Sequence, residues 1–148
     1  MSSARRPSPA AWALGLAGLI PFVMGVAAMR WPALLPWSVP GGVAMALAAY
    51  GAVIVSFLGG IHWGLAMSGA SGPSLARLAW GVVPSLLAWP ALLLPPAWSL
   101  AVLAAALVLC FMVDRRSYAA IGLAAWLPLR GVLTAVAALS CTAGAALV

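Results

Sequence analysis

Charged side chains are nearly absent from this 148-residue sequence, at 5% of all residues. A soluble domain of ordinary composition is about one quarter charged, so this chain lacks the polar surface that a soluble fold needs. It has seven basic residues, all of them arginine, and one acidic residue, Asp114. Because the arginines are scattered along the chain rather than gathered on one basic face, nucleic-acid binding is excluded.

Side chains that carry out catalysis are equally scarce. A single carboxylate excludes mechanisms that need two acidic residues, and also di-iron and most magnesium sites. His62 is the one histidine, and together with Cys110 and Cys141 it does not supply the ligand set of a zinc site. No G-x-S-x-G nucleophile motif is present. We therefore expect no enzyme, no metal site and no required cofactor, while a bound quinone or pigment stays open.

What the sequence has in abundance is hydrophobic residues, at 66%. They fall in five runs of 17 to 27 residues, and a helix needs roughly 20 residues to cross a bilayer. We therefore predict an all-α polytopic membrane bundle, a single domain of about five transmembrane helices. The expected spans are residues 11–29, 41–67, 77–94, 97–113 and 129–148. The alternative has four spans and a partly re-entrant third segment, because that segment contains Pro84 and Pro90.

The arginines also predict the orientation of the chain. Cytoplasmic segments of membrane proteins carry an excess of Arg and Lys. If the N-terminus is cytoplasmic, Arg30 lies outside, and all the other arginines lie at the inner face. The tryptophans then fall near the two interfaces, which Trp prefers. We therefore expect the N-terminus in the cytoplasm and the C-terminus outside.

The second span contains a ridge of small residues, one every fourth position. Such a ridge lets another helix approach closely within a membrane. It leaves open whether the ridge packs against the chain's own helices or against a partner. The members of this small-residue ridge are Ala48, Ala52, Ser56, Gly60 and Gly64.

A second group of residues comes together at the expected inner face. His62, Arg77, Asp114 and Arg130 arrive there from the ends of different spans. A charge just inside a span is costly unless it is paired, so we predict that Asp114 pairs with Arg130 or with Arg77. Two interpretations stay open for the cluster. It is either a surface for anionic lipid headgroups or a ligand-binding site.

Four stretches of the sequence resemble those of a known family. They are "LGLAGLIPF" (residues 14–22), "YGAVIVSFLGGIHWG" (50–64), "WGVVPSLLAW" (80–89) and "WLPLRGVLT" (126–134). In this order they resemble the domain-of-unknown-function family 3429, which comprises small bacterial membrane proteins and has an animal mitochondrial relative. The resemblance implies an integral protein of the bacterial inner membrane and a bioenergetic setting. It implies no activity.

These observations lead to three functional hypotheses. The first is a non-enzymatic accessory, assembly or scaffold subunit that packs against a larger respiratory or photosynthetic membrane complex. The second is a binding protein for a quinone, a lipid or a pigment. The third is a small transporter, which the small size of the chain and the lack of an acidic residue inside a span disfavour. The expected partners are the lipid bilayer and either other membrane-protein subunits or further copies of this chain.

Overall fold

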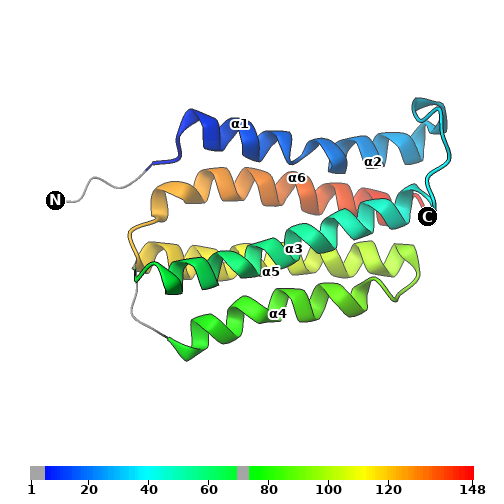
Figure 1. Ribbon diagram of the computed structural model, residues 1–148. Helices are drawn as coiled ribbons and strands as arrows, with labels where there is room; N and C mark the ends of the chain where they lie inside the picture. Colours follow the sequence, from blue (N-terminus) through cyan, green and yellow to red (C-terminus); the bar gives the residue numbers. More distant parts are fainter. Residues whose placement is uncertain (1–5, 70–73) are drawn as a thin grey trace.

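The computed structural model describes residues 6–69 and 74–148, and these fold into a bundle of helices without any strand. Figure 1 shows the helices lying side by side as rods, with α1 and α2 end to end in the first rod and successive rods running in opposite directions. The predicted all-α bundle is therefore confirmed. The helices are α1 (Pro9–Ala17), α2 (Ile20–Arg30), α3 (Val43–Met67), α4 (Leu75–Ala91), α5 (Pro96–Ala120) and α6 (Leu127–Ala146), with short 3-10 turns η1 (Pro32–Leu34) and η2 (Ala124–Trp126).

Four segments of the described chain are long and apolar enough to cross a membrane. They are Pro9–Arg30, Val43–Met67, Pro96–Ala120 and Ala124–Ala146. The remaining rod, α4, has 17 residues, which puts it at the short end of the usual range for a membrane span. It is one continuous helix that runs along the bundle beside α3 (Figure 1), although it contains Pro84. The four candidate spans of the described residues agree in number with the four-span alternative, whereas the continuous course of α4 differs from the re-entrant segment of that alternative.

The first rod is broken in the middle, where the sequence predicts a single span over residues 11–29. Helix α1 ends at Ala17 and α2 begins at Ile20. Pro21 explains the break, because it has no N–H to offer the carbonyl group of Ala17. The hydroxyl of Tyr50 on α3 donates to the carbonyl oxygen of Gly18 at 2.8 Å. The break is therefore tied to the neighbouring helix, as membrane interiors require of exposed backbone groups.

Helix α5 extends seven residues beyond the expected end of the fourth span at Val113. Asp114, Arg115 and Arg116 consequently lie on a helix, whereas the sequence predicts a connection there. The buried face of α5 explains the difference: it continues at helical spacing through Leu107, Cys110, Asp114 and Tyr118. The position of Asp114 on this face places the one carboxylate side chain inside the bundle.

Close packing of small and aliphatic side chains fills the rest of the interior. Leu47, Val55, Leu100 and Leu103 form the centre of the core together with Cys141. Both cysteines are free and buried.

Candidate functional site

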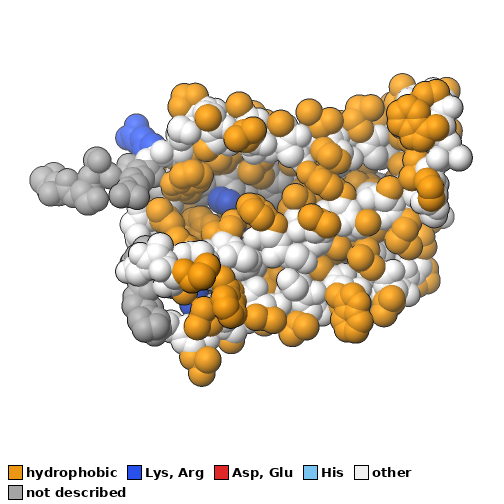
Figure 2. Space-filling model, viewed as in Figure 1, with side chains coloured by type: hydrophobic (Ala, Val, Ile, Leu, Met, Phe, Trp, Pro, Cys, Tyr) orange, Lys and Arg blue, Asp and Glu red, His pale blue; other side chains and the backbone are white. Residues whose placement is uncertain are grey.

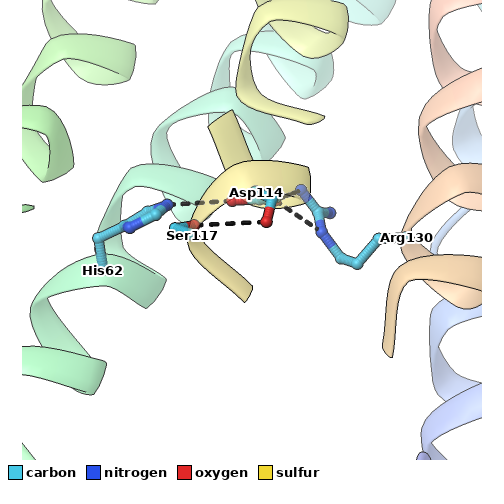
Figure 3. A network of polar contacts seen from close by, with 4 residues as sticks. All are labelled: His62, Asp114, Ser117 and Arg130. Atoms are coloured by element: carbon cyan, nitrogen blue, oxygen red, sulfur yellow. Dashed lines mark hydrogen bonds and ion pairs between the residues drawn. The ribbon is translucent and has the colours of Figure 1, made fainter. Parts of the chain in front are cut away.

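Three charged or polar side chains from three helices meet inside the bundle. Figure 3 shows Asp114 of α5 between His62 of α3 and Arg130 of α6. Nε2 of His62 lies 3.0 Å from Oδ1 of Asp114, and Nε of Arg130 donates to Oδ2 at 3.0 Å. Nη2 of Arg130 also donates to the same Oδ2. We call these three residues the charge cluster.

The charge cluster is shielded from its surroundings. The exposed fraction is 2% for His62, 2% for Asp114 and 8% for Arg130. Burial of an unpaired ion is very costly, and pairing with good hydrogen bonds compensates for much of this cost. The single negative charge of Asp114 is cancelled by Arg130, so the cluster is neutral when the imidazole of His62 is neutral. It therefore joins three rods by directed bonds, and the charges of Asp114 and Arg130 cancel within their pair.

Neighbouring side chains hold the charge cluster in place. The hydroxyl of Ser117 donates to the backbone carbonyl of Asp114 at 3.4 Å, and Tyr118, one turn further along α5, is buried beside Asp114 and Arg130. The indole ring of Trp80 on α4 meets the His62 ring edge-on, with ring centroids 6.5 Å apart. Helices α3, α4, α5 and α6 thus all contribute to this region.

The residues predicted to meet at the inner face are only partly brought together. The predicted ion pair between Asp114 and Arg130 is present. The alternative partner, Arg77, lies on the first turn of α4, and its buried Nη1 has no hydrogen-bond partner within residues 6–69 and 74–148. The contact between His62 and Asp114 was not predicted, because the fourth span was expected to stop before Asp114. The helical spacing of Leu103, Leu107 and Cys110 is the signal that leads to Asp114.

A cavity of about 310 Å³ lies beside the charge cluster. Arg130 and Thr134 of α6 line one wall, and the rest of the lining is apolar except for backbone groups at the break between α1 and α2. Figure 2 shows a hollow between α1 and α3, with blue side-chain atoms at its floor where α6 lies in Figure 1. Leu14, Ile54 and Phe57 belong to the lining as well, so the cavity lies mainly between α1, α3 and α6, and Leu107 of α5 also lines it.

Thr134 carries a polar atom that remains unsatisfied at this cavity. The residue is 5% exposed, and its hydroxyl has no hydrogen-bond partner among the described residues. Most buried polar side-chain atoms in proteins do have a partner. Sequence reasoning missed Thr134, because a threonine inside an apolar span normally bonds to its own helix.

The small-residue ridge of α3 divides into a buried part and an exposed part, with the half-buried Ser56 between them. Ala48 and Ala52 are buried in the core. At Gly60 and Gly64 nothing among the described residues lies within 4 Å of the position of an added Cβ. The closest approach of α3 to α4 occurs instead at Gly59, which is not part of the ridge. A methyl group there would overlap the carbonyl oxygen of Gly81.

Comparison with known proteins assigns the chain to a family but names no activity. A family model described as protein of unknown function (DUF3429) matches residues 7–146. Transmembrane protein 69 of Xenopus tropicalis is 46% identical over 94 residues, which is 59% of this chain and 33% of that protein. The matched part is thus about a third of the length of this relative. No solved structure matches the chain.

Proposed function

Because this chain belongs to the DUF3429 family of membrane proteins, whose description names no activity, we propose its function from the geometry of its interior. We propose that it is a non-enzymatic protein that binds a small, largely apolar molecule, a quinone or a lipid, in the cavity between α1, α3 and α6. The observation that carries this proposal is the cavity itself, which combines an apolar lining with two polar side chains at one wall.

The cavity is positioned to receive molecules that are dissolved in a bilayer. Leu14 on α1 and Phe57 on α3 line it, and their exposed fractions are 75% and 63%. The hollow in Figure 2 lies on the flank of the bundle, between the ends of the rods. If the rods cross the membrane, this flank faces the acyl chains of the lipids. A ligand then enters sideways from the bilayer and needs no passage through water.

The size and lining of the cavity suit such a ligand. Binding pockets for small molecules begin at about 300 Å³ and are mostly apolar, with a few polar groups that fix orientation. An engineered apolar cavity of about 150 Å³ is sufficient to bind benzene. A cavity of about 310 Å³ therefore has room for a substituted ring or for a few carbons of an acyl chain. Arg130 and Thr134 are the polar groups that would orient it.

The hydrogen bonds within the charge cluster support a binding role rather than catalysis. Both carboxylate oxygens of Asp114 and the Nε2 atom of His62 are already hydrogen-bonded to one another or to Arg130. The chain has no second carboxylate and no second histidine. We infer that the cluster fixes the position of Arg130 at the cavity wall.

Burial of Asp114 inside the bundle also removes one of the two arguments against a transporter, since the chain does carry an acidic residue within its helices.

The binding proposal is tested by filling the cavity. The variant Ile54→Trp places an indole in the lining, and Ile61→Trp is the matched control, because Ile61 is a partly buried isoleucine of the same helix outside the lining. Each purified protein is extracted with organic solvent, and the extract is quantified by mass spectrometry and a visible absorption spectrum. We expect a bound prenyl compound or lipid at about one per chain in the wild type and in Ile61→Trp, and its loss in Ile54→Trp. Equal recovery from all three proteins, or none from the wild type, would contradict the proposal.

A second candidate function is that of an accessory subunit in a larger membrane complex, and the exposed part of α3 favours it. None of the described residues covers the backbone at Gly60 and Gly64 on the outer surface, where a helix of another protein is able to approach closely. We propose Gly60→Leu as the test, with Val53→Leu as a control at another exposed position of α3. Purification from native membranes should yield a stoichiometric partner with the wild type and the control but not with Gly60→Leu. A wild-type chain that always elutes alone would contradict this role.

For the location, we propose a bacterial inner membrane with the N-terminus in the cytoplasm. Arg77, Arg115, Arg116 and Arg130 lie toward the same end of the bundle, and Arg30 ends α2 at the opposite end (Figure 1). Arg5 lies outside the described residues. The bias of arginines toward the cytoplasm supports this orientation. A green fluorescent protein fused to the C-terminus should then stay dark after secretory export, whereas alkaline phosphatase fused there should be active. The reverse pattern would overturn the orientation.

A further inference from the structure

Two threonines on α6 differ in how their hydroxyls are satisfied. Oγ1 of Thr142 donates to the carbonyl oxygen of Ala138, one turn earlier, at 2.9 Å. The corresponding acceptor for Thr134 is the carbonyl of Arg130, yet Oγ1 of Thr134 is buried without a hydrogen-bond partner among the described residues. Back-bonding to the previous turn is the usual solution for a threonine in a helix. Thr134 departs from it at the wall of the cavity.

A hydrogen-bond partner for the hydroxyl of Thr134 can reach it from the cavity. Thr134 is 5% exposed, and the remaining surroundings of its side chain are the packed interior. A buried hydroxyl without a partner is costly, whereas a ligand oxygen in the cavity would satisfy it. The unsatisfied hydroxyl is thus a second observation, independent of the cavity volume, that points to a ligand.

The charge cluster restricts what kind of group that ligand presents. Arg130 lines the cavity, whereas Asp114, which neutralises it, is not among the lining residues. The wall is therefore electropositive locally, but the ion pair already has its counter-charge. A group that accepts a hydrogen bond suits such a wall, and a full negative charge is not needed to balance it. An anion would instead add an unpaired charge to a membrane interior, which is unfavourable.

We infer that the hydroxyl of Thr134 donates a hydrogen bond to a neutral carbonyl oxygen of the molecule bound in the cavity, with the guanidinium of Arg130 beside it. The ligand class is thus an apolar molecule with a carbonyl group, either a quinone or an acyl ester. This inference rests on the proposed binding function and specifies the group that the site recognises. Thr134 is then a residue that determines specificity, whereas the apolar lining provides affinity for any molecule of suitable shape.

The test compares Thr134→Val with Thr142→Val in lipid nanodiscs. Valine keeps the shape of threonine and removes the hydroxyl, and Thr142 is the matched control, because it is back-bonded on the same helix. The probes are a benzoquinone with a short alkyl tail, an alkylbenzene, a methyl ester and a carboxylate with the same tail. Binding of each probe is measured by native mass spectrometry over a series of concentrations, and thermal unfolding verifies that both variants are folded.

We expect Thr134→Val to weaken binding of a carbonyl probe about three- to tenfold, the value of one neutral hydrogen bond. Binding of the alkylbenzene should be unchanged, Thr142→Val should match the wild type, and Thr134→Ser should retain carbonyl binding. Whichever of the quinone and the ester shows the larger loss identifies the source of the carbonyl.

Three results would overturn the inference but leave the proposed function intact. They are equal weakening of the carbonyl probes and the alkylbenzene, no weakening of any probe in Thr134→Val, and tighter binding of the carboxylate than of the neutral probes. If none of the probes binds to the wild type, the proposed function fails as well.

Discussion

Helix α3 meets its two main neighbours in opposite ways. Toward α5 it presents His62, which is hydrogen-bonded to Asp114 at 3.0 Å. Toward α4, one turn earlier, it presents Gly59, where the backbones approach so closely that no methyl group fits. The first contact depends on directed bonds between polar side chains, and the second depends on the absence of a side chain.

The difference shows how a membrane bundle can be specified without a hydrophobic driving force between helices. Lipid tails are as apolar as the helix surfaces, so association depends on close packing and on interhelical hydrogen bonds. The α3–α4 contact uses the first device, and Nε1 of Trp63 adds one bond to the carbonyl of Leu78 at 2.9 Å. The α3–α5 contact uses the second device and leaves room nearby for a cavity. The two contacts should therefore respond to different substitutions.

The largest expected effect comes from removing one member of the charge cluster. Asp114→Ala leaves Arg130 buried without its counter-ion, and we expect the free energy of unfolding to fall by about 3–5 kcal/mol. Unfolding in mixed micelles, followed by circular dichroism, measures this change. Arg116→Ala is the control on the exposed face of the same helix, and we expect it to change the value by less than about 0.5 kcal/mol. A loss in Asp114→Ala no greater than that in the control would show that the cluster does not hold the rods together.

The next largest effect is expected at the glycine contact. Gly59→Ala drives a methyl group against the carbonyl oxygen of Gly81, and such overpacking costs about 1–3 kcal/mol. The adjacent Gly60→Ala meets nothing within 4 Å among the described residues and should be neutral or stabilise the protein by up to about 1 kcal/mol. If both variants unfold alike, the backbones of α3 and α4 do not approach as closely as described.

A smaller effect is expected where α3 supports the broken first rod. Tyr50→Phe removes the hydrogen bond to the carbonyl of Gly18 but retains the ring that packs edge-on against Phe22. We expect a loss of about 0.5–1.5 kcal/mol. Faster hydrogen exchange at the amides around Gly18 should accompany the loss, since the break is then tied less firmly to α3. Unchanged stability together with unchanged exchange would mean that the bond does not support the break.

The smallest net effect should follow when both charges of the ion pair are replaced together. The double variant Asp114→Leu, Arg130→Met removes the buried ions and retains much of their volume. Because an apolar replacement of a whole buried pair is often neutral or stabilising, we expect its stability to stay within about 1 kcal/mol of the wild type, far above that of Asp114→Ala. Comparable losses in the single and double variants would show that the pair itself, rather than the unpaired ion, carries the stability.

The sequence predicts the bundle well and its interior only in part. The scarcity of charge and the five apolar runs suffice to predict the all-α fold. The cost of an unpaired charge within a span suffices to predict the ion pair between Asp114 and Arg130. The break after Ala17 was not predicted, because a proline in a membrane helix is tolerated in many contexts. The contact at Gly59 was not predicted either. A ridge of evenly spaced small residues does not reveal which of several glycines on a helix meets a neighbour.

The cavity could not be predicted from the hydrophobic periodicity of the sequence. It depends on the break in the first rod, on the reach of Arg130 to Asp114 and on the gap between α1 and α3, none of which is a property of one helix. The missing hydrogen bond of the Thr134 hydroxyl could not be predicted from the sequence either. Thr142 is also a threonine on α6, yet its hydroxyl is hydrogen-bonded. Only the arrangement in three dimensions separates the two threonines.

The most direct test of the binding cavity is photolabelling in native membranes with an alkylbenzoquinone that carries a diazirine on its tail. Labelled positions are read by mass spectrometry of peptides. The cavity predicts labels concentrated on its lining, at Leu14, Phe57 and Leu133, and predicts that Ile54→Trp abolishes them while Ile61→Trp does not. Labels spread over lipid-exposed residues such as Val53 and Leu93, at the same level in all three proteins, would contradict a ligand-binding cavity in this bundle.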